Sequence, residues 1–96
     1  MFIINITYKV SLDIVDENLS SHVEYLNKQY KENNFIASGR KNPRTGGVIF
    51  SKLESREKLD EIIKEDPFYI LDLADYEITE FIPTMTSDEF MNIREA

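Results

Sequence analysis

Apolar and more polar side chains alternate at the start of the chain, which is the pattern of a β-strand with one buried face. Five positions of one parity are predicted to face the core: Phe2, Ile4, Ile6, Tyr8 and Val10. The apolar spacing then lengthens to three or four residues, which predicts an amphipathic helix. Its apolar stripe is Leu19, Val23, Leu26 and Tyr30. Asp16 is the predicted N-cap of this helix, and Asn33-Asn34 is predicted to end it.

Two short apolar runs, residues 35–39 and 48–51, predict a second and a third strand. The segment between them is rich in turn-forming residues, so these strands are predicted to form a hairpin. Ser55 is the predicted cap of a second helix, which ends before Pro67. A fourth strand is predicted over residues 76–82, followed by a short amphipathic tail from Ser87.

The predicted order is therefore strand–helix–strand–strand–helix–strand. With right-handed crossovers this order gives an α+β fold, a four-stranded antiparallel sheet with two helices on one face, in the ferredoxin-like arrangement. The second face of such a sheet needs a cover. Ile3, Ile36 and Phe81 depart from the main alternation, which indicates that both faces are partly buried. We therefore expect a homodimer.

The sequence has 96 residues, no cysteine and a formal net charge of −7. This length predicts one domain over residues 1–96, in which residues 83–96 are a C-terminal tail with a short helix. The acidic balance argues against nucleic acid and anionic membranes as partners, because both attract basic proteins. The first residues lack the features of a signal peptide, and no stretch reaches transmembrane length. We expect a cytoplasmic protein.

His22 is the single histidine of the chain, and histidine is the side chain best suited to acid–base chemistry near neutral pH. The helix phase predicts that it lies at the edge of the apolar stripe, from which it can reach a cleft. Two interpretations stay open. His22 is either a general acid or base, or a boundary histidine that holds a backbone group.

Asp66 comes directly before Pro67 and Phe68, a context in which an aspartate commonly caps a short helical turn. The functional alternative is that Asp66 accepts a hydrogen bond from one nitrogen of His22, which would fix the tautomer of the ring. The two interpretations are compatible, since a capping carboxylate is already held rigidly.

Five further residues are candidates for contact with a ligand. Ser38 can orient a polar group, and Gly39 either allows close approach of a ligand or begins a turn. Arg40 and Arg44 can hold a small anion such as a carboxylate, and the alternative is a solvated hairpin tip. Phe68 is the fifth candidate for contact with a ligand. One histidine with scattered carboxylates does not make a zinc or calcium site, so we expect no metal and no cofactor.

Taken in order, these residues resemble the YciI-like (YCII-related) family. The resemblance covers Phe2–Pro83 and rests on His22, on Asp66-Pro67-Phe68, and on the segments FIASG (35–39), PRTGGV (43–48) and YEITEF (76–81). It implies a ferredoxin-like fold that dimerises as an α+β barrel, with a His22–Asp66 pair in a cleft near Ser38. The chain departs from the family's common Ser-Gly-Pro, because Arg40 follows Gly39 and alters the charge at the cleft rim.

Two functions are compatible with such a site. The first is a small lyase or isomerase that uses the His22–Asp66 pair as a general acid/base on a small polar or anionic substrate. Dehydrochlorinases and muconolactone isomerase-like enzymes are the activities that the resemblance implies. The second is a non-enzymatic dimeric module that binds a small molecule in the same cleft. Fold alone does not separate them.

Overall fold

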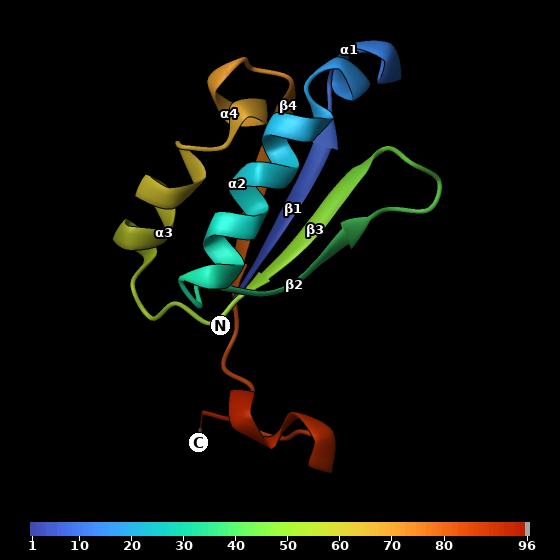
Figure 1. The fold of residues 1–96 in the computed structure, drawn as a ribbon. Coiled ribbons are helices and arrows are strands. Elements are labelled where there is room, and N and C mark those ends of the chain that lie inside the picture. The colour runs from blue at the N-terminus through green and yellow to red at the C-terminus, as the bar shows by residue number, and fades with distance from the viewer. Residues whose placement is uncertain (96) are drawn as a thin grey trace.

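An antiparallel sheet of four strands forms the framework of the molecule, in the order β2-β3-β1-β4 (Figure 1). The computed structural model describes residues 1–95. Residue 96, the last residue of the predicted tail, lies outside the described residues. The strands are β1 (Phe2–Tyr8), β2 (Phe35–Arg40), β3 (Gly46–Ser51) and β4 (Ala74–Glu80).

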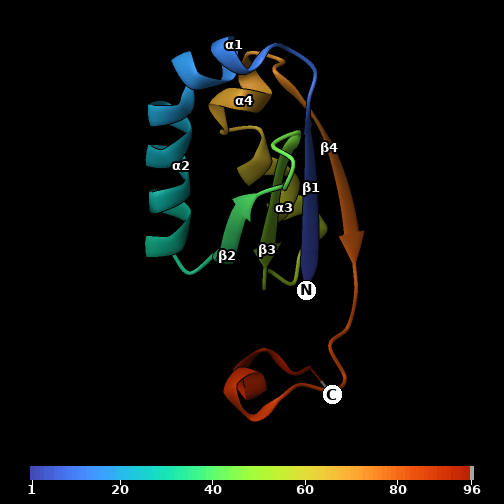
Figure 2. The same cartoon turned by 90° about the vertical axis from the view of Figure 1, so that its right-hand side faces the viewer.

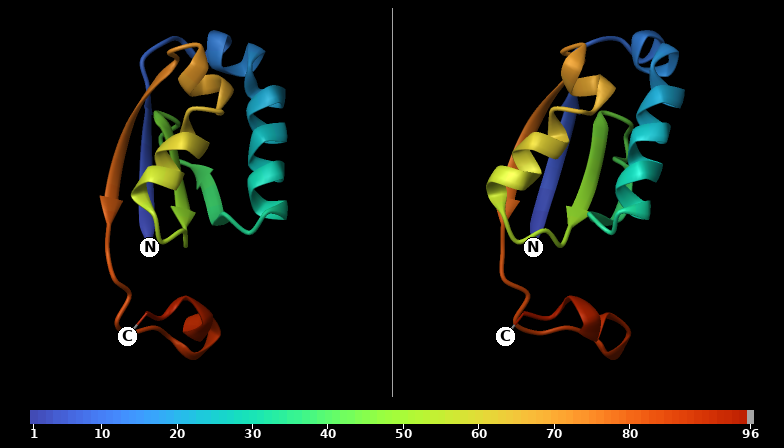
Figure 3. Two further views of the ribbon diagram at one scale, coloured as in Figure 1. Left: turned by 90° about the vertical axis from the view of Figure 1, so that its left-hand side faces the viewer. Right: turned by 60° about the vertical axis from the view of Figure 1, so that its left-hand side comes forward.

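The helices that pack on this sheet lie on one of its faces (Figures 2 and 3). The helical elements are α1 (Leu12–Glu17), α2 (Leu19–Lys31), α3 (Arg56–Ile63), α4 (Pro67–Ile70) and a 3-10 helix, η1 (Asp88–Ile93). The main helices α2 and α3 connect the strands as predicted, so the ferredoxin-like α+β fold is confirmed. The short helices α1 and α4 are additions at one end of α2 and α3.

The alternation in β1 separates the two faces of the sheet. Phe2, Ile4 and Ile6 are buried beneath the helices. Their register partners carry the same face across the sheet, with Ile4 opposite Ile49 in β3 and opposite Ile78 in β4. Residues of the other parity form the face opposite the helices α1–α4, which we call the open face. It includes Ile3, Asn5, Val48 and Phe50.

The apolar stripe predicted for α2 is wrong in phase. The buried residues of α2 are His22, Tyr25 and Gln29, whereas Val23 is 43% exposed. Polar side chains are buried here because they have partners: the Asn34 side-chain amide donates to Gln29 Oε1 over 2.9 Å. The apolar pattern therefore pointed about one residue away from the true buried face, and His22 lies within that face rather than at its edge.

The start of this helical region also differs from the prediction. Asp16 is not an N-cap, because it lies inside the additional helix α1, which Ser11 precedes. A separate helix, α2, begins after Asn18. The extra turn forms because Val15 is fully buried beside Phe68 and Leu73, in a small cluster of its own.

Gly46 and Gly47 belong to β3, although they were predicted as part of the turn. Gly46 pairs with Thr7 of β1, and a Cβ atom on Gly46 would overlap the Ile6 carbonyl oxygen. Glycine is required here because the neighbouring backbone comes too close for any side chain. Strand β4 also begins earlier than predicted, since pairing with β1 extends to Ala74 opposite Tyr8.

Several predicted local signals are confirmed. The Ser55 hydroxyl accepts a hydrogen bond from the Lys58 backbone N–H and caps α3. Asn33 adopts a positive φ of 61° after α2 ends. The C-terminal tail extends beyond the strand ends (Figure 1), where the N-terminal amine pairs with Glu95 over 3.4 Å.

Among the described residues, no helix is long and apolar enough to cross a membrane.

Candidate functional site

Asp66 occupies a rigid position at the start of α4. Its Oδ1 atom accepts a hydrogen bond from the Phe68 backbone N–H over 3.0 Å, as expected of a helix cap. Pro67 occupies the first turn, where its missing N–H costs nothing. The residue is 0% exposed, so the cap is formed inside the protein.

The structure brings His22 and Asp66 together from positions 44 residues apart in the sequence. His22 Nδ1 lies 2.8 Å from Asp66 Oδ1. The second oxygen, Oδ2, accepts a hydrogen bond from the Tyr76 hydroxyl over 2.5 Å. Burial, followed by the nearby charge of Asp66, raises the pKa of the Tyr76 hydroxyl well above its usual range. Tyr76 therefore stays protonated and acts as a donor.

These contacts assign the protons at the pair. A carboxylate that receives the Phe68 N–H and the Tyr76 hydroxyl is an acceptor, so the Nδ1 atom of His22 carries a proton and donates to it. In the neutral ring Nε2 then holds the lone pair. This arrangement matches that of a general base oriented by a carboxylate.

Aromatic packing fixes the plane of the imidazole. The Phe68 ring lies parallel to the His22 ring at a centroid distance of 4.0 Å and an angle of 3°. Tyr8 packs edge-on against the other end of this stack, with its ring 6.0 Å from that of Phe68. The short segment from Asp66 to Phe68 thus supplies both the hydrogen-bond partner of His22 and the surface on which its ring rests.

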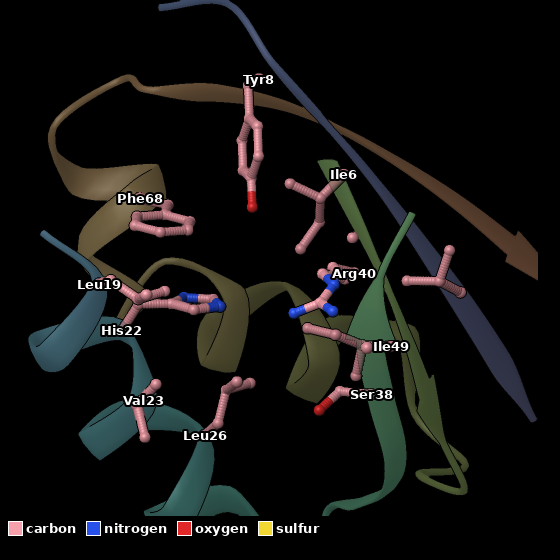
Figure 4. Close-up of a pocket in the computed structure, with 13 residues that line it drawn as sticks. Ile6, Tyr8, Leu19, His22, Val23, Leu26, Ser38, Arg40, Ile49 and Phe68 are labelled. Atoms are coloured by element: carbon pink, nitrogen blue, oxygen red, sulfur yellow. The ribbon is translucent and has the colours of Figure 1, made fainter. Parts of the chain in front are cut away.

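The His22 ring extends into a cavity of about 170 Å³ between α2 and the strands (Figure 4). The Tyr8 hydroxyl and the Arg40 guanidinium also point into this space (Figure 4). Most of the remaining wall is apolar. The lining residues are Ile6, Tyr8, Leu19, His22, Val23, Leu26, Ser38, Gly39, Arg40, Gly47, Val48, Ile49 and Phe68.

Most of the predicted ligand contacts lie at this cavity. Ser38, Gly39, Arg40 and Phe68 line it together with His22, and the Ser38 hydroxyl is hydrogen-bonded to the Tyr30 hydroxyl. A Cβ atom on Gly39 would meet no other atom within 4 Å, but Gly39 pairs with Val48, so this free space lies toward the open face of the sheet.

Arg44 is the predicted contact that does not line the cavity. Its guanidinium donates to Asp16 over 2.5 Å, and this hydrogen bond raises the pKa of Arg44 above its usual value. Arg44 lines a neighbouring hollow of about 400 Å³, which it shares with Tyr8 and Arg40. Arg44 thus lies beside the cavity with one nitrogen of its guanidinium engaged by Asp16, and its contact with a ligand stays a prediction.

Two tyrosines of the site were missed in the sequence. Tyr8 and Tyr76 lie at core-facing positions of β1 and β4, and alternation assigns such positions to packing alone. The residue type could have revealed them, because a tyrosine at a buried strand position brings a hydroxyl that needs a partner.

Within residues 1–95, no group of three or more acidic or histidine side chains is arranged to hold a metal ion.

Comparison with known proteins places this architecture in a family. The model of the YCII-related domain matches residues 1–82. Among solved structures, the fold is similar to that of 5-chloro-2-hydroxyhydroquinone dehydrochlorinase from Burkholderia phenoliruptrix AC1100, in complex with 2,5-dihydroxybenzoquinone. The TM-score is 0.73 at 19% identity, covering 83% of this chain and 91% of that one. Among curated proteins, no relative matches the chain.

Proposed function

The chain belongs to the YCII-related domain family, and from that premise we propose that it is a small lyase or isomerase whose His22–Asp66 pair acts as a general acid/base. The observation that carries the proposal is the 2.8 Å contact from His22 Nδ1 to the buried Asp66, which leaves Nε2 available to the cavity. The dehydrochlorinase activity of the structural neighbour supports this class of reaction.

In the proposed reaction, His22 Nε2 removes a proton from an acidic carbon or hydroxyl of the substrate. The electron pair left behind collects on an oxygen as an enolate-like anion, and Asp66 stabilises the imidazolium that forms. An isomerase returns the same proton to another position of the substrate. A lyase instead uses the electron pair to expel a leaving group from the neighbouring carbon.

Arg40 is the proposed anchor for the anionic oxygen, because its guanidinium points into the cavity opposite His22 (Figure 4). The Tyr8 hydroxyl is a second donor toward the same space. Ser38 and Gly39 form the polar part of the rim, and the apolar wall favours a small, flat substrate. Arg44 lies beside the cavity rather than in its wall, and one nitrogen of its guanidinium contacts Asp16.

Proton exchange into small molecules tests the proposal without knowledge of the natural substrate. We would incubate the protein in D₂O with small enolisable acids and hydroxyquinones, including 2,5-dihydroxybenzoquinone, and follow loss of carbon-bound protons by NMR. We expect His22→Gln to slow the catalysed exchange by about 10²–10⁴-fold, the range of general acid–base catalysis. Glu24→Gln, on the exposed side of the same helix, is the matched control.

The same experiment separates the enzyme from a non-enzymatic binding module. In a binding module, compounds of the panel would raise the melting temperature and His22→Gln would weaken their binding, yet none would exchange faster than in buffer. Exchange that proceeds equally in His22→Gln and in the wild type would contradict the assignment of His22 as the base.

We also propose that the protein is a homodimer joined through the open face of the sheet. The open face carries Ile3, Val48 and Phe50, and Phe50 is 38% exposed although it lies in the interior strand β3. A sheet of this size buries such a face against a second layer. Two copies that meet face to face would supply that layer to each other.

Light scattering at micromolar concentration tests the dimer. We expect a mass of two chains for the wild type and of one chain for Phe50→Glu, because the new carboxylate would be buried without a partner. Ile70→Glu is the matched control, since Ile70 is exposed on α4, on the helical side of the sheet. A wild-type monomer, or equal masses for the two variants, would contradict this interface.

A further inference from the structure

A third residue completes the hydrogen bonding of Asp66 on the side away from His22. Asp66 Oδ1 receives His22 Nδ1 and the Phe68 backbone N–H, whereas Oδ2 receives the Tyr76 hydroxyl. We propose that Tyr76 is a positioning residue of the acid/base site, which holds Asp66 as an oriented carboxylate so that His22 keeps its proton on Nδ1. This inference rests on the proposed function of the His22–Asp66 pair.

The hydroxyl of Tyr76 matters more here than its ring. Tyr76 lies opposite Ile6 in the pairing of β4 with β1, at a core-facing position where phenylalanine would fill the same space. Asp66 is fully buried, and among the described residues the Tyr76 hydroxyl is the one donor to Oδ2. Without this hydroxyl, one oxygen of a buried carboxylate would lack a hydrogen bond. That loss removes one of the contacts that hold the carboxyl group in the orientation that His22 requires.

The direction of the hydrogen bond follows from the environment of Tyr76. Burial and the neighbouring Asp66 charge raise the pKa of the hydroxyl, so it keeps its proton and donates. Two donors, the Phe68 N–H and the Tyr76 hydroxyl, thus point at Asp66 whatever the state of the imidazole. A carboxylate held in this way is an acceptor for His22 Nδ1 and favours the Nδ1–H tautomer.

Tyr76 acts through Asp66 and does not contact the cavity. It is absent from the cavity wall and instead lines a separate hollow of about 190 Å³ with Asp60, Lys64 and Tyr69. The Tyr69 ring packs edge-on against it at 5.6 Å. The Tyr76 ring also packs against the cluster that contains Phe68, whereas its hydroxyl contacts Asp66, so removal of the hydroxyl alone tests the route through the carboxylate.

The single histidine allows a direct spectroscopic test, because the imidazole signals of the ¹⁵N-labelled full chain belong to His22 alone. In the wild type we expect the Nδ1–H tautomer and a slowly exchanging Nδ1 proton. In Tyr76→Phe we expect a mixture of tautomers. We also expect the Nδ1 proton to exchange with solvent about tenfold faster, because the loss of one hydrogen bond to a charged group changes an equilibrium constant by about that factor.

Tyr25→Phe is the matched control. It removes the same atom from the same core, but the Tyr25 hydroxyl donates to the Ile62 carbonyl and not to Asp66. Because the Tyr25 ring stacks on His22 and is kept in this variant, we expect the tautomer and the Nδ1 exchange rate of His22 to match those of the wild type. If Tyr25→Phe shifts the tautomer as much as Tyr76→Phe, the effect is general loosening of the core and the inference is overturned.

Asp66→Asn separates failure of this inference from failure of the proposed function. If Asp66→Asn changes the His22 signals and Tyr76→Phe does not, the pair stands and the role of Tyr76 is wrong. If neither variant changes them, the His22–Asp66 pair itself is wrong.

Should Tyr76→Phe fail to fold, Tyr76 can be replaced by 3-fluorotyrosine, which keeps the ring and donates a stronger hydrogen bond. An unchanged Nδ1 proton signal in that protein would then overturn the inference.

Discussion

At the scale of single residues, Asp66 links local and long-range structure. One oxygen caps α4 through the Phe68 N–H and also accepts the His22 ring, and the other accepts the Tyr76 hydroxyl. A helix cap normally contributes to one element, but this one lies at the junction of α2, α4 and β4. Its removal would leave three donors without partners in a region that water does not reach.

We predict that Asp66→Ala lowers the free energy of unfolding by about 3–5 kcal/mol, because it combines loss of a cap with loss of buried hydrogen bonds to a charge. Urea denaturation measures this change. Asp16→Ala is the control, since it breaks an exposed ion pair with Arg44 and should cost about 1 kcal/mol or less. Equal losses in the two variants would show that the buried hydrogen bonds of Asp66 contribute little.

At the scale of elements, the helix caps and the strand pairing show how local chemistry sets the boundaries. Ser55 and Ser11 each adopt an extended backbone conformation directly before a helix. Of the two, only Ser55 makes a side-chain hydrogen bond that caps its helix. The same residue type at equivalent positions therefore makes different contributions to stability.

We predict that Ser55→Ala destabilises the protein by about 1 kcal/mol, because the Lys58 N–H loses its acceptor. Ser11→Ala should change stability by about 0.5 kcal/mol or less. Thermal unfolding of the two variants in one buffer compares them directly. A larger effect of Ser11→Ala would indicate a role for Ser11 beyond the start of α1.

The pairing of β1 with β3 depends on the absence of a side chain at Gly46. We predict that Gly46→Ala costs about 2–3 kcal/mol, because the new methyl group would overlap the Ile6 carbonyl and force the strands apart. Gly39→Ala is the matched control in the neighbouring strand, where a Cβ atom meets open space and the change should stay within about 0.5 kcal/mol. Chemical denaturation of both variants tests the difference.

At the scale of the whole molecule, the sheet separates two environments. The helical face encloses the core and the His22 cavity, whereas the open face is the one we propose to be covered by a second copy. Tyr25 and Tyr76 both belong to the enclosed side, and burial followed by the charge of Asp66 raises the pKa of each hydroxyl. The folded state therefore keeps these two protons at a pH where the unfolded chain loses them.

This difference predicts a loss of stability at alkaline pH. Below about pH 10, the usual tyrosine value, the contribution of both groups is fully present. Above it the unfolded chain binds fewer protons than the folded one, so the free energy of unfolding falls by about 1.4 kcal/mol per pH unit for each tyrosine. Urea denaturation between pH 8 and about pH 11 measures the slope. Tyr25→Phe and Tyr76→Phe should each make it shallower, and an unchanged slope in both would contradict the assignment.

The sequence by itself determined the fold class and the order of the four strands and the two main helices, because alternation, helical spacing and caps act over a few residues. The capping positions of Ser55 and Asp66 could be read from their immediate neighbours. His22 could be singled out because it is the single histidine of the chain. Its candidate partner Asp66 was named through the family resemblance and its position before proline.

Only the tertiary structure decided what lies inside the site. The phase of α2 differed from its apolar stripe because His22 finds its partner in the distant Asp66 and Gln29 finds its partner in Asn34 just beyond the helix, and a count of apolar residues detects neither contact. The pairing of Arg44 with Asp16 joins residues 28 positions apart, and the Tyr76 hydroxyl in β4 reaches back to Asp66 at the start of α4. Hydrogen bonds of this kind form only after the sheet has set the distances between its elements, so local sequence patterns do not contain them.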